Sequence, residues 1–273
     1  LADQSSRQET WYQLRIPIES YNKKIGNIPD FKSIRFIRMF LTGFDDSVVV
    51  RFGKLALVRN TWRKFEYKLD TTGNYSPEVT NDFNVGAVNI EENDKRAPLP
   101  YRTPSDIQRV QTLSNNGVNL LQNEQSLSLQ FCGLNQNDGK AVFQTFASRD
   151  LRQFGSLKLY IHAETPRGTQ LNDNDLVADI RLGSDFVSNY YEVRIPLKLT
   201  PLNTGLNPDS KEYNDTLWIQ SNNLNVDLYQ LTQLKNARNL SSTPLNTLFS
   251  QLQSNGQTYS VIGNPNLGDI GGI

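Results

Sequence analysis

Hydrophobic and polar residues alternate along several short stretches of the chain. In SLSLQF (126–131) the two leucines and the phenylalanine fall on one parity, and SLKLYIHA (156–163) and NLNVDL (223–228) repeat the arrangement. A period of two is typical of a β-strand that buries one face against a core and leaves the other in water. These stretches therefore predict half-buried strands.

Two longer stretches near the N-terminus are apolar on both parities. They are SIRFIRMFLTG (33–43) and SVVVRFGKLALV (47–58), and Gly53 interrupts the second. A strand that is apolar on both faces is typical of the centre of a structure, where both faces are covered. We expect central strands here, with Gly53 at a bulge where the register changes.

Helix signals are few, and turn residues separate the strand-like stretches. The best candidate has Thr243 as N-cap, Pro244 at the first helical position, an apolar stripe at helical spacing and Gly256 as its stop. A second, shorter candidate covers residues 228–238. The stretch 70–104 is polar, rich in Asn, Asp and Pro, and without periodicity, which predicts an irregular connector.

One short sequence occurs twice in the chain. WYQLRIPIES (11–20) and YYEVRIPLKL (190–199) both begin with paired aromatic residues and share Arg-Ile-Pro at the same offset. The first copy is followed by GNIPDFKSIRF (26–36) and the second, after a longer insertion, by YSVIGNPNLGDIGGI (259–273). We interpret this as a tandem pair of related β-sandwich units. The chain then begins late in the first unit and ends before the last strands of the second.

The repeat and the strand pattern together define the expected fold. The class is all-β, built of tandem jelly-roll (galactose-binding-like) β-sandwich units with few short helices. Residues 1–69 form the C-terminal part of a first unit, residues 70–104 the connector, and residues 105–273 a second unit truncated at its C-terminal end. On this interpretation the chain is a piece of a longer protein. Its second unit then exposes an unpaired sheet edge that tends to pair with another copy.

Composition narrows the possible partners. The chain has 28 basic and 28 acidic residues and a formal net charge of zero, which gives no global reason to expect nucleic acid as a partner. Cys132 is the only cysteine, so an intrachain disulfide is impossible. The sequence contains no stretch of the roughly 18 apolar residues that a membrane-spanning helix needs.

The residues that could carry chemistry are sparse. His162 is the only histidine and lies inside an alternating strand, so a Ser-His-Asp triad would depend on it alone. Cys132 precedes a glycine turn, where we expect a small buried or half-buried side chain. Asp173, Asn174 and Asp175 offer oxygen ligands of the kind calcium accepts, but without the spacing of a twelve-residue calcium loop, and a hairpin turn explains the same letters. We therefore expect no catalytic residue, no metal and no cofactor.

The paired aromatic residues have a structural interpretation. Trp11-Tyr12 and Tyr190-Tyr191 open the two copies of the repeat, where we expect them to pack at sandwich edges or at the seam between units. Ligand stacking is the alternative for such residues. No pattern in the sequence identifies a partner-binding residue.

Long, distinctive strings recur along the chain. They are IPDFKSIRFIRMFLTGF (28–44), FGKLALVRNTWRKFEY (52–67), DLRQFGSLKLYIHAE (150–164), DNDLVADIRLGSDFVSNYYEVRIPLKLTP (173–201), LWIQSNNLNVDL (217–228) and GNPNLGDI (263–270). Together they resemble the SprA/Sov family, the giant outer-membrane translocon proteins of the Bacteroidota type IX secretion system, which are also required for gliding motility. The resemblance runs from about Trp11 to Ile270 and excludes the connectors at 75–100 and 203–214.

The resemblance implies a role in protein export. Members of this family form a single-chain, very large outer-membrane β-barrel that can enclose a lumen wide enough for folded cargo. The present chain is then expected to be a soluble, non-enzymatic segment of the cap or vestibule, on the extracellular side rather than the periplasmic one. The implied partners are the remainder of the same chain, a small outer-membrane barrel protein, a periplasmic plug protein and secreted cargo.

Two alternatives from other classes remain at this stage. A carbohydrate-binding β-sandwich module would display aromatic residues for stacking on sugars, and Trp218 and Tyr101 are the first candidates. A glycoside hydrolase fragment would need two carboxyl groups roughly 5–9.5 Å apart in a cleft.

Overall fold

The computed structural model describes residues 12, 14, 16, 21–26, 37–53, 62–65, 69, 83–109, 111–113, 119–121, 124–134, 136, 138–166 and 168–273. The chain divides into two compact units, Leu1–Leu57 and Val58–Ile273, which are taken separately below. The domain boundaries expected at 69/70 and 104/105 stay a prediction.

The described residues of the first unit contain no β-strand. Residues 37–53 run without a hydrogen-bonded ladder, and their side chains are exposed. The central strands predicted at 33–43 and 47–58 are therefore wrong for residues 37–43 and 47–53, while 33–36 and 54–58 lie outside the described residues. A strand that is apolar on both faces needs a covering layer on each side, and no described residue of this unit supplies one.

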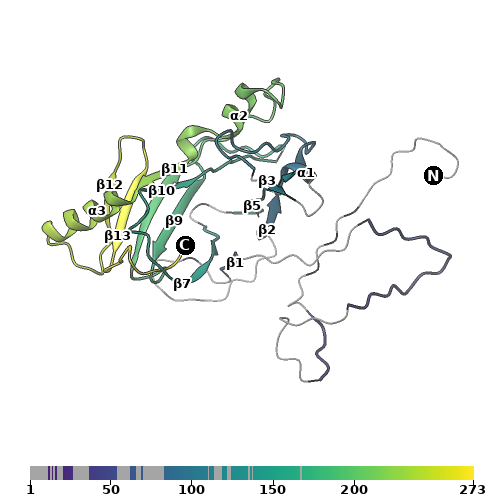
Figure 1. Cartoon of the computed structure of the whole chain (residues 1–273), viewed down its shortest axis with the longest axis horizontal. Coiled ribbons are helices and arrows are strands. Elements are labelled where there is room, and N and C mark those ends of the chain that lie inside the picture. The colour runs from purple at the N-terminus through teal and green to yellow at the C-terminus, as the bar shows by residue number, and fades with distance from the viewer. Residues whose placement is uncertain are drawn as a thin grey trace. The chain divides into compact units, whose positions relative to one another are not determined.

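The second unit is organised around a six-stranded antiparallel sheet (Figure 1). The repeat YYEVRIPLKL forms its third strand, β10, which lies between β9 and β13. In spatial order the strands are β12 (Phe249–Leu252), β13 (Thr258–Ile262), β10 (Tyr190–Pro196), β9 (Val177–Gly183), β14 (Ile270–Gly272) and β7 (Thr145–Arg149).

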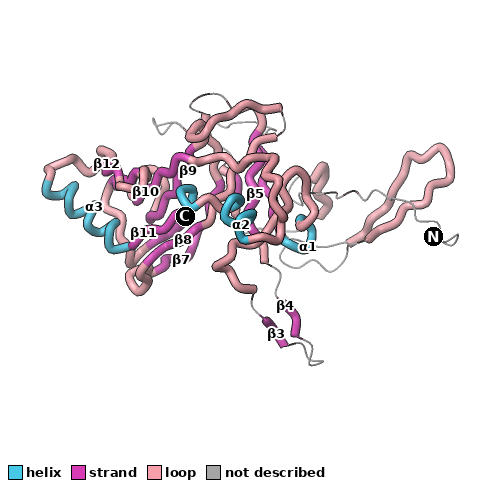
Figure 2. The backbone as a smooth tube through the Cα atoms, turned by 90° about the horizontal axis from the view of Figure 1, so that it is seen from above, coloured by secondary structure: helices cyan, strands magenta, loops and turns pink. Residues whose placement is uncertain are grey.

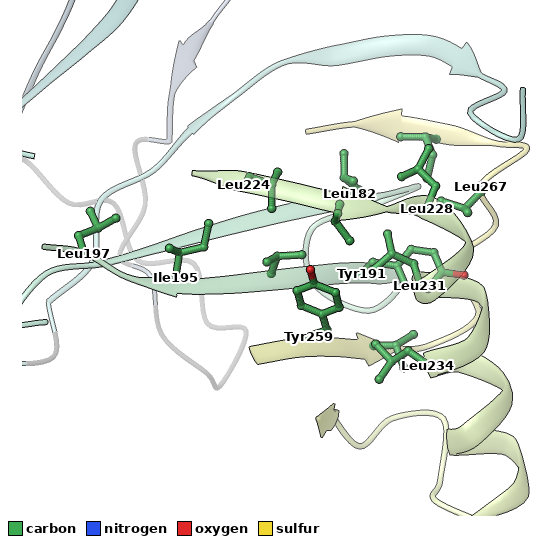
Figure 3. Close-up of a cluster of buried hydrophobic side chains, with 14 of the residues drawn as sticks. Leu182, Tyr191, Ile195, Leu197, Leu224, Leu228, Leu231, Leu234, Tyr259 and Leu267 are labelled. Atoms are coloured by element: carbon green, nitrogen blue, oxygen red, sulfur yellow. The ribbon is translucent and has the colours of Figure 1, made fainter. Parts of the chain in front are cut away.

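Alternation along β10 divides the two faces of this sheet. Tyr191, Val193 and Ile195 are buried on the face that carries the core, and Glu192 and Arg194 lie on the other. Helix α3 (Leu228–Leu240), strand β11 (Leu224–Asp227) and its partner β8 (Ser156–Leu159) supply the opposing apolar side chains (Figure 3). The core is therefore a layer between the main sheet and the α3–β11–β8 group.

The sequence of α3 explains its position. Asp227 caps the helix by accepting a hydrogen bond from the backbone N–H of Tyr229 at 2.9 Å. Leu228, Leu231 and Leu234 then recur on one side and are buried. The helix expected over 228–238 is confirmed, and it extends to Leu240.

The helix predicted over 243–256 is wrong. Residues 249–252 form β12, which pairs with β13 so that Phe249 lies opposite Val261. Gly256 has a φ of +83° and lies in the hairpin turn that the N–H of Gln253 and the carbonyl of Gln257 close at 2.8 Å. The apolar spacing fitted a helix, but pairing with a neighbouring strand, which no local pattern shows, decided the structure.

Part of the predicted irregular connector is ordered. Residues 83–88 form β2 (Phe83–Val88), which pairs with β5 (Ser126–Phe131) and stacks Phe83 on Phe131 at 5.1 Å between ring centroids. In FNVGAV the residues Phe83, Val85 and Ala87 do fall on one parity, but Asn84 and Gly86 are uncommon in strands, so the stretch does not look like one. The strands predicted within 126–131, 156–163 and 223–228 are confirmed as β5, β8 and β11. The burial expected of the apolar face is wrong for β5, where Leu127, Leu129 and Phe131 are exposed.

The remaining elements are short, and helices occupy a small part of the chain (Figure 2). Among the described residues, no helix has both the length and the apolar character needed to cross a membrane. The all-β class with few short helices is confirmed, and the sheet fits a β-sandwich, whereas the jelly-roll connectivity stays a prediction. These elements are β1 (Arg63–Lys64), paired with β6 (Val142–Phe143), β3 (Gln111–Leu113), paired with β4 (Asn119–Leu121), α1 (Ile90–Asn93), α2 (Lys211–Leu217) and the 3₁₀ turn Gln220–Asn222.

Candidate functional site

Three candidate residues of the sequence, Tyr101, His162 and Trp218, meet in one cluster at the C-terminal end of α2. The indole ring has three ring neighbours in edge-to-face geometry, namely Tyr101, Tyr160 and His162, with centroids 6.0–6.2 Å away. Its N–H donates to the carbonyl of Arg102 at 2.9 Å. Edge-to-face pairs of this kind stabilise packing. The ring of Trp218, which was proposed to stack on sugars, thus already contacts three rings of the protein itself.

Tyr101, the second proposed stacking residue, is buried. Its hydroxyl group lies 2.7 and 2.8 Å from the two carboxylate oxygens of Glu124 and 2.8 Å from Oγ of Ser126. Burial, together with the hydrogen bond to Glu124, raises the pKa of Tyr101 well above its usual range. The ring and the hydroxyl group of Tyr101 are both used inside the protein.

His162 connects this cluster to an ion pair. Its Nε2 lies 3.1 Å from Oε2 of Glu164, and Arg96 contacts both carboxylate oxygens of Glu164, at 2.5 and 2.6 Å. Burial by itself raises the pKa of Glu164, but the hydrogen bonds from His162 and Arg96 outweigh this and lower the pKa to about 2. The carboxylate therefore stays ionised throughout the neutral range.

The surroundings of His162 resemble a catalytic triad in composition but not in function. Thr200 Oγ1 lies 3.2 Å from Nδ1, which gives a hydroxyl, an imidazole and a carboxylate in a row. However, Nδ1 also lies 2.9 Å from the carbonyl oxygen of Leu217, which can only accept a hydrogen bond. A ring nitrogen that donates to a carbonyl cannot take the proton of Thr200, which is itself buried. This arrangement fixes the segment that follows β8 to the C-terminal end of α2, and His162 lies beyond the strand in which it was expected.

The cluster holds residues 96–105 against α2. The hydroxyl group of Tyr213 donates to the carbonyl of Pro100 at 2.7 Å, and the amide of Asn214 donates to the carbonyl of Thr103 at 2.8 Å. Arg102 forms an ion pair with Asp209 at 2.8 Å. These contacts join segments more than 100 residues apart, so the cluster acts as a structural clamp.

Two further candidates have different outcomes. Asp173 accepts from the N–H of Leu199 at 2.9 Å, and Asp175 from that of Asn172 at 2.8 Å. These bonds confirm a turn, but it is no hairpin, because the strands before and after it, β8 and β9, do not pair with each other. Cys132 is exposed, so the buried or half-buried position expected for it is wrong, because β5 has already ended at the residue before it. Within the described part of the chain, no group of three His, Cys, Asp or Glu side chains is placed to hold a metal ion.

The aromatic pairs of the repeat differ between the two copies. Tyr191 lies in the core, and Tyr190 packs on the other face under the guanidinium group of Arg181, 4.4 Å from the ring centroid. The pair therefore packs inside the protein, but on a strand within the sheet and not at the sandwich edge or the seam between units that was expected. Tyr12 is exposed, so the same expectation is wrong for it in its own unit, and Trp11 lies outside the described residues.

Sequence reasoning missed a buried cation that fixes the GNPNLGDI string. Arg238 of α3 is almost fully buried and donates to the carbonyl of Gly263. Lys235, three residues earlier, donates to the carbonyl of Pro265 at 2.8 Å, and Tyr191 reaches the same oxygen at 3.3 Å. The sequence does contain a sign of this buried cation, because Arg238 continues the leucine stripe of α3 four residues after Leu234.

The described residues define a β-rich structural module, in which the aromatic, histidine and arginine side chains connect segments to one another. The model of a family described as motility related/secretion protein, SprA_N, matches residues 2–273. The chain therefore belongs to this family, and the resemblance to SprA/Sov proteins is confirmed. A comparison with individual curated proteins gives no match.

Proposed function

We propose that this chain is a non-enzymatic, soluble segment of the giant outer-membrane translocon that exports folded proteins in type IX secretion and supports gliding motility. Its role is that of a scaffold in the cap or vestibule of the pore, on the extracellular side. Family membership supports the assignment to secretion and motility. The scaffold role is supported by a comparison of the two copies of the repeat.

The two copies have opposite burial at equivalent positions. Tyr191, Val193 and Ile195 of the second copy are 2%, 2% and 0% exposed, under α3 and β11. The corresponding residues of the first copy, Tyr12, Leu14 and Ile16, are 83%, 84% and 79% exposed within their unit. Burying side chains of this size is worth about 1.5–3 kcal/mol each. The first copy thus carries a core face without the layer that covers its counterpart.

A second feature of the first unit supports the same conclusion. Gly26 and Gly263 each open the motif that follows a copy of the repeat, and both have positive φ, +79° and +69°. The two glycines therefore share the left-handed backbone conformation. In residues 37–53 of the first unit, large apolar side chains are exposed at many positions, which include Phe40, Phe44, Val49 and Phe52.

The occupant of this apolar face is the remainder of the same translocon chain. The second unit shows what such a layer is made of, namely leucine- and valine-bearing strands and a helix. The small outer-membrane barrel protein, the periplasmic plug protein and secreted cargo are further proposed partners of the whole assembly. In this proposal the first unit provides a docking face and the second a preformed block.

Cysteine labelling tests this docking face. In a Cys132→Ser background, Leu14→Cys is reacted with a maleimide, once in the isolated chain and once in the intact secretion protein in its membrane. We expect the labelling rate of Leu14→Cys to fall at least about tenfold in the intact protein. The control, Tyr229→Cys on an exposed position of α3, should label in both. Equal labelling of Leu14→Cys in the two settings would contradict the proposal.

A genetic measurement addresses the secretion role. Leu14→Asp in the intact protein should abolish export and spreading of the cells, because a carboxylate cannot be buried in an apolar layer without a large free-energy cost. Val49→Asp tests the second exposed apolar stretch and should have the same effect. The control variant Tyr229→Asp should leave export and spreading unchanged. Normal export by Leu14→Asp would refute the scaffold role of this face.

A further inference from the structure

A shallow groove with glutamine walls runs between α3 and the β12–β13 hairpin. Its volume is about 230 Å³. Leu234 and Tyr259, both buried and close to each other in Figure 3, form its floor. The walls carry four glutamines, Gln230 and Gln233 from α3 and Gln251 and Gln253 from the hairpin.

The lining has an unusual chemical character. No charged residue and no carboxylate lies among the residues that line this groove. A glutamine amide offers two donor hydrogens and an acceptor oxygen without charge. The side-chain amides of Gln230, Gln233 and Gln251 make no hydrogen bond to any other residue in the part of the chain that the structure describes. The groove therefore presents neutral, unused hydrogen-bonding groups above an apolar floor.

The groove lies beside an open edge of the sheet. β12 ends the strand order, and β13 is its only neighbour among the described strands. An edge strand presents a row of unpaired backbone N–H and C=O groups along its free side. Gln251 projects on the same face as Phe249, toward α3, so the free edge and the glutamine groups are accessible from one side.

We propose that the β12 edge and this groove bind an extended, uncharged polypeptide segment by strand addition. The backbone of the segment pairs with β12, and alternate side chains of the segment reach the groove. The glutamines favour neutral polar side chains such as threonine and asparagine. This binding site does not depend on the proposed scaffold role, because it uses only residues of the second unit.

The geometry favours a polypeptide over a neutral glycan. Sugar recognition by aromatic residues requires an accessible ring face, whereas Tyr259 is almost fully buried and contributes only to the floor. A glycan also cannot continue the regular ladder of backbone hydrogen bonds along β12, as a strand can. Binding of a glycan is therefore a separate outcome, which the experiment must distinguish from binding of a peptide.

The experiment measures binding of a fluorescent, end-capped ten-residue peptide of alternating threonine and asparagine to the whole chain by fluorescence anisotropy. We expect saturable binding that weakens at least about tenfold, or about 1.4 kcal/mol, in the double variant Gln233→Ala/Gln251→Ala. Gln153→Ala, an exposed glutamine outside the groove, is the matched control and should bind normally. A peptide of alternating lysine and glutamate should bind at least about tenfold more weakly.

Hydrogen exchange gives an independent readout of strand addition. The bound peptide should slow amide exchange within residues 249–252, and this protection should disappear in the double variant. Unchanged thermal unfolding of the variant shows that it folds, since its two side chains are exposed. The proposal would be overturned by absence of saturable peptide binding, by binding that is unaffected in the double variant, or by a dimer through β12 that Leu252→Lys abolishes. Binding of neutral oligosaccharides, instead of the peptide, with the same dependence on Gln233 and Gln251 would overturn it too.

Discussion

The ion pair between Glu164 and Arg96 offers the sharpest test of the clamp around Trp218. The variant Glu164→Gln keeps the size of the side chain and one acceptor oxygen but removes the charge. Arg96 and His162 then lose the carboxylate that both contact. These residues connect segments 68 positions apart in the sequence, so the loss weakens a tertiary contact and leaves local structure in place.

The expected magnitude follows from the pKa. The pKa of Glu164 falls from 4.5 to about 2 on folding, and each unit corresponds to about 1.4 kcal/mol, which gives about 3 kcal/mol. Because 23% of the side chain is still exposed to solvent, screening reduces this value. We expect the free energy of unfolding to fall by about 2 kcal/mol at pH 7.

The lowered pKa of Glu164 also fixes how its contribution to stability changes with pH. A carboxyl group with a lowered pKa stabilises the folded state fully above its unfolded pKa, here 4.5, and this stabilisation is lost as the pH falls through the range down to about 2. Urea unfolding at a series of pH values, followed by tryptophan fluorescence, measures this. The difference between the wild type and Glu164→Gln should shrink steadily between pH 4.5 and pH 2.

A control and a contrary result complete the test. Asp215→Asn removes the partner of Lys211 in an exposed ion pair one turn apart on α2, and this variant should leave the unfolding curve essentially unchanged. The reasoning is refuted if Glu164→Gln costs less than about 0.5 kcal/mol at pH 7. A cost that stays constant down to pH 2 would show that the effect is steric and unrelated to charge.

Two further predictions concern the packing of the second unit. Trp218→Ala removes the ring that three neighbours contact, and it should lower the free energy of unfolding in urea by about 3 kcal/mol. Calorimetric titration with neutral sugars should show no binding for wild type or variant. Saturable sugar binding that is lost in the variant would instead favour the carbohydrate-binding alternative. Gly263→Ala places a Cβ 1.9 Å from the carbonyl oxygen of Ser188 at a φ of +69° and should cost more than about 2 kcal/mol. Gly205→Ala, at a φ of +63° with open space around it, should cost only about 1 kcal/mol, and equal melting temperatures for the two variants would contradict this account.

The parts of the fold that depend on local pattern could be predicted from the sequence. The alternation in 223–228 was sufficient for β11 and its buried face, because a period of two places alternate side chains on one side. In 126–131 the alternation predicted the strand β5 but not its burial, because its apolar residues are the exposed ones. The stripe at 245–252 was not sufficient, because its spacing suits a helix and only the pairing with β13 makes it a strand. Local pattern therefore failed where the deciding contact was with another strand.

The clamp could not be predicted, because its members have no common local pattern. Arg96 and Glu164 lie in segments with different expected structures, and only the tertiary fold brings them within 2.5 Å. His162 was recognised as unusual, but its function in the fold depends on the carbonyl group of Leu217, which no sequence pattern can show. Buried networks of this kind are specified by their partners together.

The two copies of the repeat suggest why one sequence serves two purposes. A strand with aromatic, valine or leucine, and isoleucine residues on one parity needs an apolar layer, whichever protein segment supplies it. In the second unit α3 and β11 supply that layer from the same 216 residues. In the first unit Tyr12, Leu14 and Ile16 have the same requirement, and no described residue of that unit meets it. The same strand sequence is thus covered in the second unit and uncovered among the described residues of the first, so its burial depends on the segments packed against it and not on the repeat itself.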